Sequence, residues 1–229
     1  MKKNSRLLWE IDMVRIVCIL IGYCFGLIQT AYIYGKMNGI DIRTVGSGNA
    51  GTTNALRVLG KKAGLIVFLG DVAKTVAAVI VVRLLFGASY PDSIYMLMLY
   101  TAAGVILGHN YPFYLGFKGG KGIAATAGLI AALGPWFILV EGLVFIVVFT
   151  TTHYVSLGSL LVYVALMIHL VLFGQNGLLP GMTQPALNEM YLVALFLLLM
   201  AFWRHRTNIK KLIEGTERKT YISKKNKLD

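Results

Sequence analysis

The sequence is poor in charge. Of its 229 residues only 14% are Asp, Glu, Lys or Arg, whereas 57% are hydrophobic, and the mean hydropathy of +0.69 lies above the range of ordinary soluble domains. No polar stretch is long enough to form a separate soluble domain, and no internal repeat is apparent. These absences exclude an ordinary soluble enzyme and a repeat protein, and they indicate a chain that lies largely in lipid.

Cysteine is also scarce. Cys18 and Cys24 lie in one apolar segment, where their spacing puts them on different helix faces, so they cannot form a disulfide with each other. The sequence has no CxxC pair and no metal-binding cluster, so neither a metal nor another cofactor is expected. A His-x4-Asp pair is missing too, because the fifth residue after His109 is Tyr114, which disfavours the soluble-type and membrane-associated enzymes that use that dyad.

Long apolar runs dominate what is present. One of them, residues 123–152, would span about 45 Å as a single helix, too long for a hydrocarbon core of about 30 Å. Gly134-Pro135 lies inside this run and predicts a helix break there. The sequence therefore predicts an all-α, polytopic integral-membrane helical bundle of about seven segments, one of them short or broken. The apolar runs cover residues 13–31, 64–86, 94–107, 123–152, 157–173 and 191–203.

Positive charge follows the loops. Most of the Lys and Arg residues behind the net charge of +12 lie in residues 35–63, 117–121 and 204–229, whereas residues 88–93 and 174–188 contain Asp92 and no Lys or Arg. The positive-inside rule makes the basic end cytoplasmic, with the C-terminus and the active site there. Seven segments then put the N-terminus outside, which conflicts with its own Lys2, Lys3, Arg6 and Arg15. A nucleic-acid partner is not expected, because the charge forms no single stripe.

The first candidate site is the glycine-rich run of residues 46–54, followed by Arg57. Glycines allow successive backbone N–H groups to point at one anion, and Arg can hold phosphate with two hydrogen bonds. A short helix beginning near Thr52 would add its N-terminal potential. The alternative is a flexible polar loop. A Walker loop is excluded, because its spacing is absent.

The second candidate site begins at Gly108-His109 and continues as Phe117-Lys118-Gly119-Gly120-Lys121-Gly122. We interpret it as a second phosphate-binding loop, in which backbone N–H groups and Lys121 face the substrate. The alternative for the lysines is anchoring at the membrane surface. His109 is equally consistent with a structural role at a helix end.

The third candidate site follows the last apolar run, where His205 and Asn208 share a helix face if that helix continues through them. A basic cluster at this place is also typical of a stop signal facing lipid. Within the second run, Asp71 and Lys74 are spaced as a structural ion pair, although an intramembrane charge pair is also a site hypothesis. Ser156 is either a helix cap or a hydroxyl donor to substrate.

In combination these motifs resemble the acyl-phosphate-dependent glycerol-3-phosphate acyltransferase (PlsY) family over almost the whole chain. The resemblance rests on Ser47-Gly48-Asn49-x-Gly51 with Asn54 and Arg57, on Gly108-His109 with the 117–122 run, and on Arg204-His205 with Asn208-Ile209 and Gly215. It implies transfer of a fatty acyl group from acyl phosphate to glycerol 3-phosphate, giving 1-acyl-glycerol 3-phosphate (lysophosphatidic acid) in a bacterial cell membrane.

The resemblance also assigns residues. It implies that Ser47, Arg57, Lys121, His205 and Asn208, with Ser156, surround the phosphate of glycerol 3-phosphate, while the acyl chain lies between helices. Ser47, Lys121 and His205 are the catalytic candidates, and the general base is either His205 or the substrate's own phosphate. The substrate-binding candidates are Gly48, Asn49, Asn54, Arg57, His109, Lys118, Gly119, Gly120, Ser156 and Asn208.

Residues 1–217 are predicted to form one transmembrane acyltransferase domain, and residues 218–229 a basic cytoplasmic tail. The expected partners are the two substrates, the lipid bilayer and, as a further candidate, the soluble enzyme that makes acyl phosphate. The alternative function is a membrane transporter of an organophosphate anion. A transporter predicts a site near mid-membrane and matching halves, whereas the candidate ligands here gather at one membrane surface.

Overall fold

The protein is all-α, as predicted. A computed structural model describes the backbone of residues 2–221 and the side chains of residues 13–221. Within that range the chain forms helices joined by short loops, with one 3-10 turn, η1 (Phe113–Leu115). The α-helices are α1 (Lys2–Gly26), α2 (Thr30–Met37), α3 (Thr52–Leu59), α4 (Lys61–Phe86), α5 (Ile94–Asn110), α6 (Ile123–Leu133), α7 (Pro135–Thr152), α8 (Val155–Gln175), α9 (Gln184–Arg204) and α10 (Arg206–Ile213).

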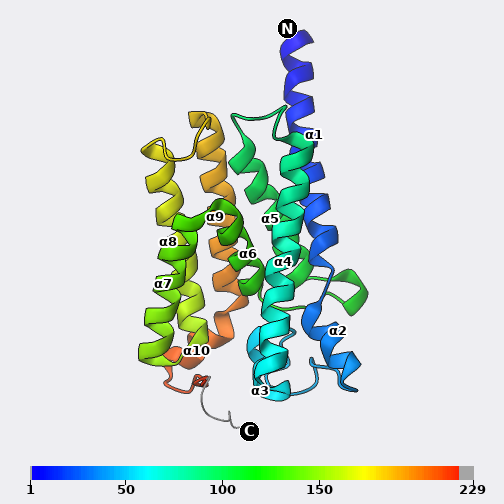
Figure 1. The fold of residues 1–229 in the computed structure, drawn as a ribbon, viewed down its shortest axis with the longest axis vertical. Coiled ribbons are helices and arrows are strands. Elements are labelled where there is room, and N and C mark those ends of the chain that lie inside the picture. The colour runs from blue at the N-terminus through cyan, green and yellow to red at the C-terminus, as the bar shows by residue number, and fades with distance from the viewer. Residues whose placement is uncertain (1, 222–229) are drawn as a thin grey trace.

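Long helices run side by side along the long axis (Figure 1). Five candidate spans are long and apolar enough to cross a membrane: residues 13–37, which join α1 to α2, and helices α4, α7, α8 and α9. The 17-residue α5 is buried along most of its length, and α6 is a shorter apolar helix. Together these elements confirm the predicted seven segments, one of them short.

The predicted break at Gly134-Pro135 is confirmed. Helix α6 ends at Leu133 and α7 begins at Pro135, where the missing N–H of proline costs nothing in the first turn. The Gly134 φ of 126° lies in a region that glycine adopts readily. With 11 residues, α6 is about 16 Å long, so it reaches about half-way across a hydrocarbon core of about 30 Å.

Helices α1 and α5 approach unusually closely, along glycines that the sequence reading did not use. A Cβ on Gly22 would lie 2.0 Å from Thr101 O, and one on Gly26 would lie 2.3 Å from Val105 O. The partner helix repeats the pattern, with a Cβ on Gly104 only 2.2 Å from Ile19 O. This is the small-xxx-small packing of membrane helices. It fixes the depth of α5, and therefore of His109 at its end.

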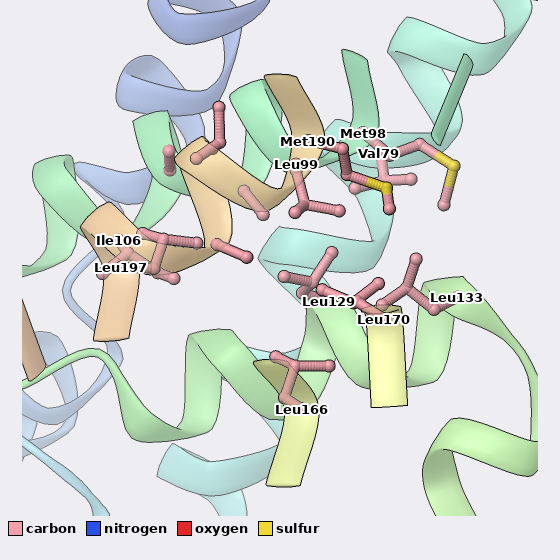
Figure 2. Close-up of a cluster of buried hydrophobic side chains, with 14 of the residues drawn as sticks. Val79, Met98, Leu99, Ile106, Leu129, Leu133, Leu166, Leu170, Met190 and Leu197 are labelled. Carbon is pink, nitrogen blue, oxygen red and sulfur yellow. The ribbon is translucent and has the colours of Figure 1, made fainter. Parts of the chain in front are cut away.

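The apolar core lies where α5 meets α4, α6, α8 and α9. Figure 2 shows its centre, with side chains from all five helices in one cluster. Because the hydrophobic effect does not favour one apolar surface over another inside lipid, packing and polar contacts hold such a bundle together. The labelled residues are Val79, Met98, Leu99, Ile106, Leu129, Leu133, Leu166, Leu170, Met190 and Leu197.

Charged side chains within the bundle are paired. Arg15 of α1 binds Glu189 of α9 through both carboxylate oxygens, and the Tyr100 hydroxyl donates to the same carboxylate at 2.7 Å. His169 Nδ1 lies 2.9 Å from Glu141 Oε1 between α8 and α7. Because Glu189 balances the charge of Arg15, that arginine does not count as a loop cation, which reduces the conflict over the N-terminus.

The two ends of the bundle are formed by different helices and loops. Helices α2, α3 and α10 lie at the end where the described C-terminal residues lie, and α1 begins at the opposite end (Figure 1). The opposite end holds the loops of residues 87–93 and 176–183, joined by a 3.2 Å hydrogen bond from Thr183 N to Asp92 O. Helix α9 begins at Gln184, earlier than its apolar run, because its first turns are polar and hydropathy does not detect them.

Candidate active site

The first glycine-rich loop is shaped from inside by Asn54. Its Oδ1 accepts from Ser47 N at 2.8 Å, and its Nδ2 donates to Ile42 O at 2.9 Å and to Val45 O at 3.0 Å. Gly46 has a φ of 61°, and a Cβ there would lie 2.3 Å from Asn54 Oδ1. The predicted substrate-binding role of Asn54 therefore needs correction: its buried amide holds the loop, because both of its polar groups are already bonded.

The loop leads into a short helix, as expected. Helix α3 begins at Thr52, after an N-cap at Gly51. Ser47 and Gly48 are exposed, and Asn49 is half-buried. Arg57 lies one turn further along α3, at the end of the bundle where the other two candidate sites also lie.

The second loop returns its backbone to the end of α5. Gly119 N donates to Asn110 O at 3.2 Å, and Gly120 N donates to His109 O at 3.1 Å. The expectation that these two N–H groups face the substrate is therefore wrong, because they satisfy carbonyls that the helix end leaves free. Lys121 and the N-terminus of α6 remain as the donors of this loop.

Arg204, at the end of α9, binds the backbone of the second loop. Its NH2 donates to Gly120 O at 2.6 Å, and its guanidinium lies 5.0 Å from the centre of the Tyr111 ring. Lys118 is exposed, and its ammonium has no polar partner among the described residues. Lys121 is half-buried, and its ammonium donates to Asn208 Oδ1. The second and third candidate sites are thus joined by one hydrogen bond.

The third segment is not one continuous helix. Helix α9 ends at Arg204 and α10 begins at Arg206, so the shared helix face assumed for His205 and Asn208 does not exist. The break nevertheless leaves both residues beside Lys121. His205 Nδ1 lies 2.8 Å from Ala201 O, and a carbonyl can only accept. The proton of the neutral ring is therefore on Nδ1, and Nε2 carries a free electron pair.

Burial lowers the pKa of both titratable groups of this cluster, Lys121 and His205. It lowers the pKa of Lys121 to about 8, opposed by nearby Glu217 and reinforced by Arg204. Burial also lowers the pKa of His205 to about 4, and the charge of Lys121 adds to that effect. At neutral pH Lys121 is therefore mainly a cation and His205 is neutral.

The residues after α10 fold back over the site. Glu217 Oε1 accepts from Ser156 Oγ at 2.8 Å and from Asn208 Nδ2 at 2.7 Å. Arg57 NH2 donates to Thr220 Oγ1 at 2.5 Å, and Thr220 is buried. The packed chain thus continues beyond residue 217, where the predicted tail begins. Residues 222–229 of that tail lie outside the described residues.

A cavity of about 220 Å³ lies where these segments meet. Positive groups dominate its lining, as an anion site requires. Ser47, Arg57 and Asn208 therefore share one cavity, and Lys121 and Ser156 each bond to one of its lining residues. The lining residues are Gly46, Ser47, Arg57, Asn208, Lys211, Glu217 and Arg218.

Sequence reasoning left two residues of this site unassigned. Arg204 belongs to a motif that gives it no separate role, and no charge pattern indicates that it binds the Gly120 carbonyl. Glu217 gave a usable signal: it is an acidic residue within a basic segment that is close to a predicted phosphate site. Such a residue indicates an internal partner for hydroxyl, amide or cationic groups.

Gly120→Ala is expected to lower kcat/KM by about 100-fold, because an error of about 1 Å in a catalytic group costs that much. The new Cβ would lie 2.1 Å from His109 Nε2 and 2.8 Å from Ala50 O, so the loop must shift and carry Lys121 with it. Initial rates of the purified variant measure the effect. Gly142→Ala is the matched control, because a Cβ there meets no atom within 4 Å. Equal rates in both variants would contradict the prediction.

Comparison with known proteins agrees with this geometry. The sequence matches the profile of the family described as Glycerol-3-phosphate acyltransferase over residues 16–215. It is 43% identical over 206 residues to the glycerol-3-phosphate acyltransferase of Clostridioides difficile (strain 630), covering 89% of this chain and 94% of the relative. The enzyme of the same name from Shouchella clausii (strain KSM-K16) is 43% identical over 205 residues, covering 89% and 95% of the two chains.

Solved structures give the same answer. The crystal structure of PlsY (YgiH), an integral membrane glycerol 3-phosphate acyltransferase, in its glycerol 3-phosphate form, superposes with a TM-score of 0.77 at 31% identity. The alignment covers 90% of this chain and 96% of that one. The lysophosphatidic acid form of the same enzyme gives a TM-score of 0.76 and covers 91% and 96% of the two chains. Motifs, fold and relatives agree: the chain belongs to the glycerol-3-phosphate acyltransferase family.

Proposed function

We propose that the protein transfers a fatty acyl group from acyl phosphate to glycerol 3-phosphate in a bacterial cell membrane. The observation that carries this proposal is the convergence of Ser47, Arg57, Lys121 and Asn208 on one cavity and its edge. The hydroxyl oxygen of glycerol 3-phosphate attacks the acyl carbon of acyl phosphate. The bond between that carbon and the phosphate oxygen breaks. The hydroxyl proton leaves with the phosphate. The products are lysophosphatidic acid, as its 1-acyl isomer, and phosphate.

Ser47 and Arg57 bind the phosphate of glycerol 3-phosphate in this proposal. Both line the cavity, and the planar guanidinium of Arg57 offers two parallel N–H donors to two phosphate oxygens. Gly48 and Asn49 contribute the exposed edge of the loop. The Glu217 carboxylate bonds to Ser156 and Asn208 in this structure, so a bound phosphoryl group would compete with it for those donors.

Lys121 stabilises the negative charge that develops as the carbonyl is attacked. Acyl phosphate has a good leaving group, so no nucleophilic side chain is needed. His205 Nε2 has a free electron pair, but a pKa of about 4 makes this ring a weak base at neutral pH. We therefore assign to His205 the orientation of the attacking hydroxyl, and the released phosphate finally accepts the proton of that hydroxyl.

The acyl chain of the donor lies in the lipid-facing part of the bundle, and the basic end faces the cytoplasm. That orientation also gives access to the soluble enzyme that makes acyl phosphate. The acyltransferase domain extends beyond residue 217 in this proposal, because Thr220 bonds to Arg57 and Glu217 bonds to Ser156. Lys118, exposed at the same end, attracts the anionic donor to the membrane surface.

The experiment that tests the function is phosphate release from acyl phosphate by purified protein in detergent, with and without glycerol 3-phosphate. Release that depends on glycerol 3-phosphate, with lysophosphatidic acid as product, supports the proposal. Absence of turnover would overturn the choice of donor. Uptake of labelled glycerol 3-phosphate into proteoliposomes, with no acyl transfer, would instead establish the transporter alternative.

The orientation predicts which cysteines are labelled from outside the cell. In a variant with Cys18 and Cys24 replaced by serine, a single cysteine at Ser89 should react with an impermeant maleimide on intact cells. A single cysteine at Thr44 should react only after the cells are opened. Ser89 and Thr44 lie in loops at opposite ends of the bundle, so the pair forms its own matched control. The reverse pattern would invert the assigned topology.

The reaction is expected to slow at high pH. Lys121 has a pKa lowered to about 8, and it is charged below that value and neutral above it. Because the charged form is the useful one, log kcat/KM should be flat from pH 7 and fall above about pH 8. The phosphate of glycerol 3-phosphate, with a second pKa near 6, is already almost fully charged in this range. Lys121→Arg should remove the fall, since guanidinium stays charged. A pH limb that remains in Lys121→Arg belongs to another group.

A further inference from the structure

A buried polar cluster lies next to Gly120 of the second loop, within the helical bundle. Lys74 Nζ of α4 is 2.8 Å from Asp71 Oδ1, 2.7 Å from Ile28 O and 2.9 Å from His109 Nδ1 of α5. Asp71 is 1% exposed, Lys74 4% and His109 3%. The ion pair predicted for Asp71 and Lys74 therefore forms, and it has a third member that the sequence did not reveal.

The contacts of Lys74 determine where the proton of His109 lies. A lysine ammonium has three N–H donors and no acceptor, and here three acceptors surround it. His109 Nδ1 must therefore accept, so it carries no proton. A second proton on the ring would also put two cations within contact distance inside the bundle, which is unfavourable. The arrangement selects the neutral ring with its proton on Nε2.

The Nε2 side of the ring faces the place where the first two loops meet. A Cβ on Gly120 would lie 2.1 Å from His109 Nε2 and 2.8 Å from Ala50 O. Gly120 precedes Lys121, and Ala50 belongs to the first loop. No described residue accepts a hydrogen bond from Nε2, although the ring is buried. The Nε2 atom keeps some accessible surface, so its N–H is available to a ligand.

We propose that Asp71 and Lys74 are positioning residues that hold His109 as its Nε2–H tautomer, and that this N–H donates a hydrogen bond to an oxygen of the bound acyl phosphate. The inference rests on the proposed function for the identity of that ligand. His109 exchanges no proton in the step. A neutral donor fixed in place stabilises charge as it develops, without reorganising. Lys74 acts only through the ring.

The tautomer is tested first, by ¹⁵N NMR of protein labelled at histidine. The chain has 4 His residues, so His153→Gln, His169→Gln and His205→Gln assign the remaining signals to His109 by elimination. We expect a protonated Nε2 and an unprotonated Nδ1 in the resting wild-type protein. A protonated Nδ1, or a doubly protonated ring, would overturn the proposal. Because this measurement needs no turnover, it stands apart from the proposed function.

Variants then test whether Lys74 determines the tautomer of His109. In Lys74→Met the His109 signals should shift toward a mixture of tautomers, whereas Lys62→Met, an exposed lysine of the same helix, should leave them unchanged. Lys74→Arg also only donates, so it should keep the Nε2–H form. Unchanged signals in Lys74→Met would overturn the positioning role. The wild-type spectrum alone decides the tautomer if Lys74→Met does not fold.

Kinetics separate positioning from general support of the fold. His109→Phe and Lys74→Met should each lower kcat by roughly 100-fold, the loss seen when one transition-state donor is removed, with KM for glycerol 3-phosphate nearly unchanged. The double variant should be no slower than His109→Phe alone, because residues acting through one contact are not additive. Additive losses would mean that Lys74 acts independently of the ring.

Discussion

Lys121→Ala will lower kcat by about 10²- to 10³-fold, the range measured when one donor to a developing anion is removed. Lys121 is half-buried, and its ammonium is held by Asn208 Oδ1 beside the N-terminus of α6. The attack on acyl phosphate creates negative charge on the carbonyl oxygen of the acyl group, which is neutral in the bound substrate. A fixed cation there acts more strongly on the transition state than on the bound substrates. The fall should therefore appear in kcat, with a small change in KM for glycerol 3-phosphate.

Initial rates over a range of both substrates measure this split. Lys62→Ala is the matched control, since it removes an exposed lysine at the same end of the bundle. Lys121→Arg retains the charge but not the shape, and we expect it to recover part of the rate. If Lys121→Ala raised only KM, Lys121 would be a ground-state ligand and the assigned role would be wrong.

Arg57→Ala is expected to act mainly on KM for glycerol 3-phosphate, raising it by roughly 100-fold or more. Loss of one partner from a buried charge pair costs about 2–5 kcal/mol, and each 1.4 kcal/mol is tenfold. Arg57 lines the cavity and presents a planar fork to phosphate. Arg57→Lys keeps the charge without the fork, so its effect should be intermediate.

Two controls isolate the phosphate contact. Thr220→Val removes the shorter of the two hydrogen bonds that Arg57 makes to the folded-back segment and leaves the guanidinium in place, so KM should change by no more than about threefold. Arg83→Ala removes an equal charge at the opposite end of α4, where Arg83 is exposed. A rise in KM in Thr220→Val as large as that in Arg57→Ala would assign the effect to the segment instead of the phosphate.

The membrane helices were predictable because hydropathy acts on each segment separately. The break in the fourth run followed from its length and from Pro135, both local properties. Even so, the first turns of α9 were missed, since polar residues such as Gln184 and Asn188 begin the helix outside its apolar run. Local signals define which segment lies in lipid, and they define its ends less well.

The site was predictable as a set of loops but not as a set of contacts. Glycines beside cations indicated a phosphate site at Ser47, Arg57 and Lys121, and the structure brings these residues to one cavity and its edge. The inward turn of Asn54 was not, because an amide suits a ligand and a loop equally well. The backbone of Gly119 and Gly120 was misassigned for a similar reason: which carbonyl a glycine N–H meets depends on α5, which lies next to that loop only in three dimensions.

The contact between α1 and α5 has a consequence for biosynthesis. Helices α2, α3 and α4 are all made between these two partners, so α1 enters the bilayer well before the helix whose backbone it touches. Until α5 is inserted, the Gly22 and Gly26 face of α1 has only lipid or α4 to meet. A nascent chain stopped after α4 therefore lacks the glycine contact between α1 and α5. Late arrival of α5 makes α1 dependent for its packing on a helix that is made later in the chain.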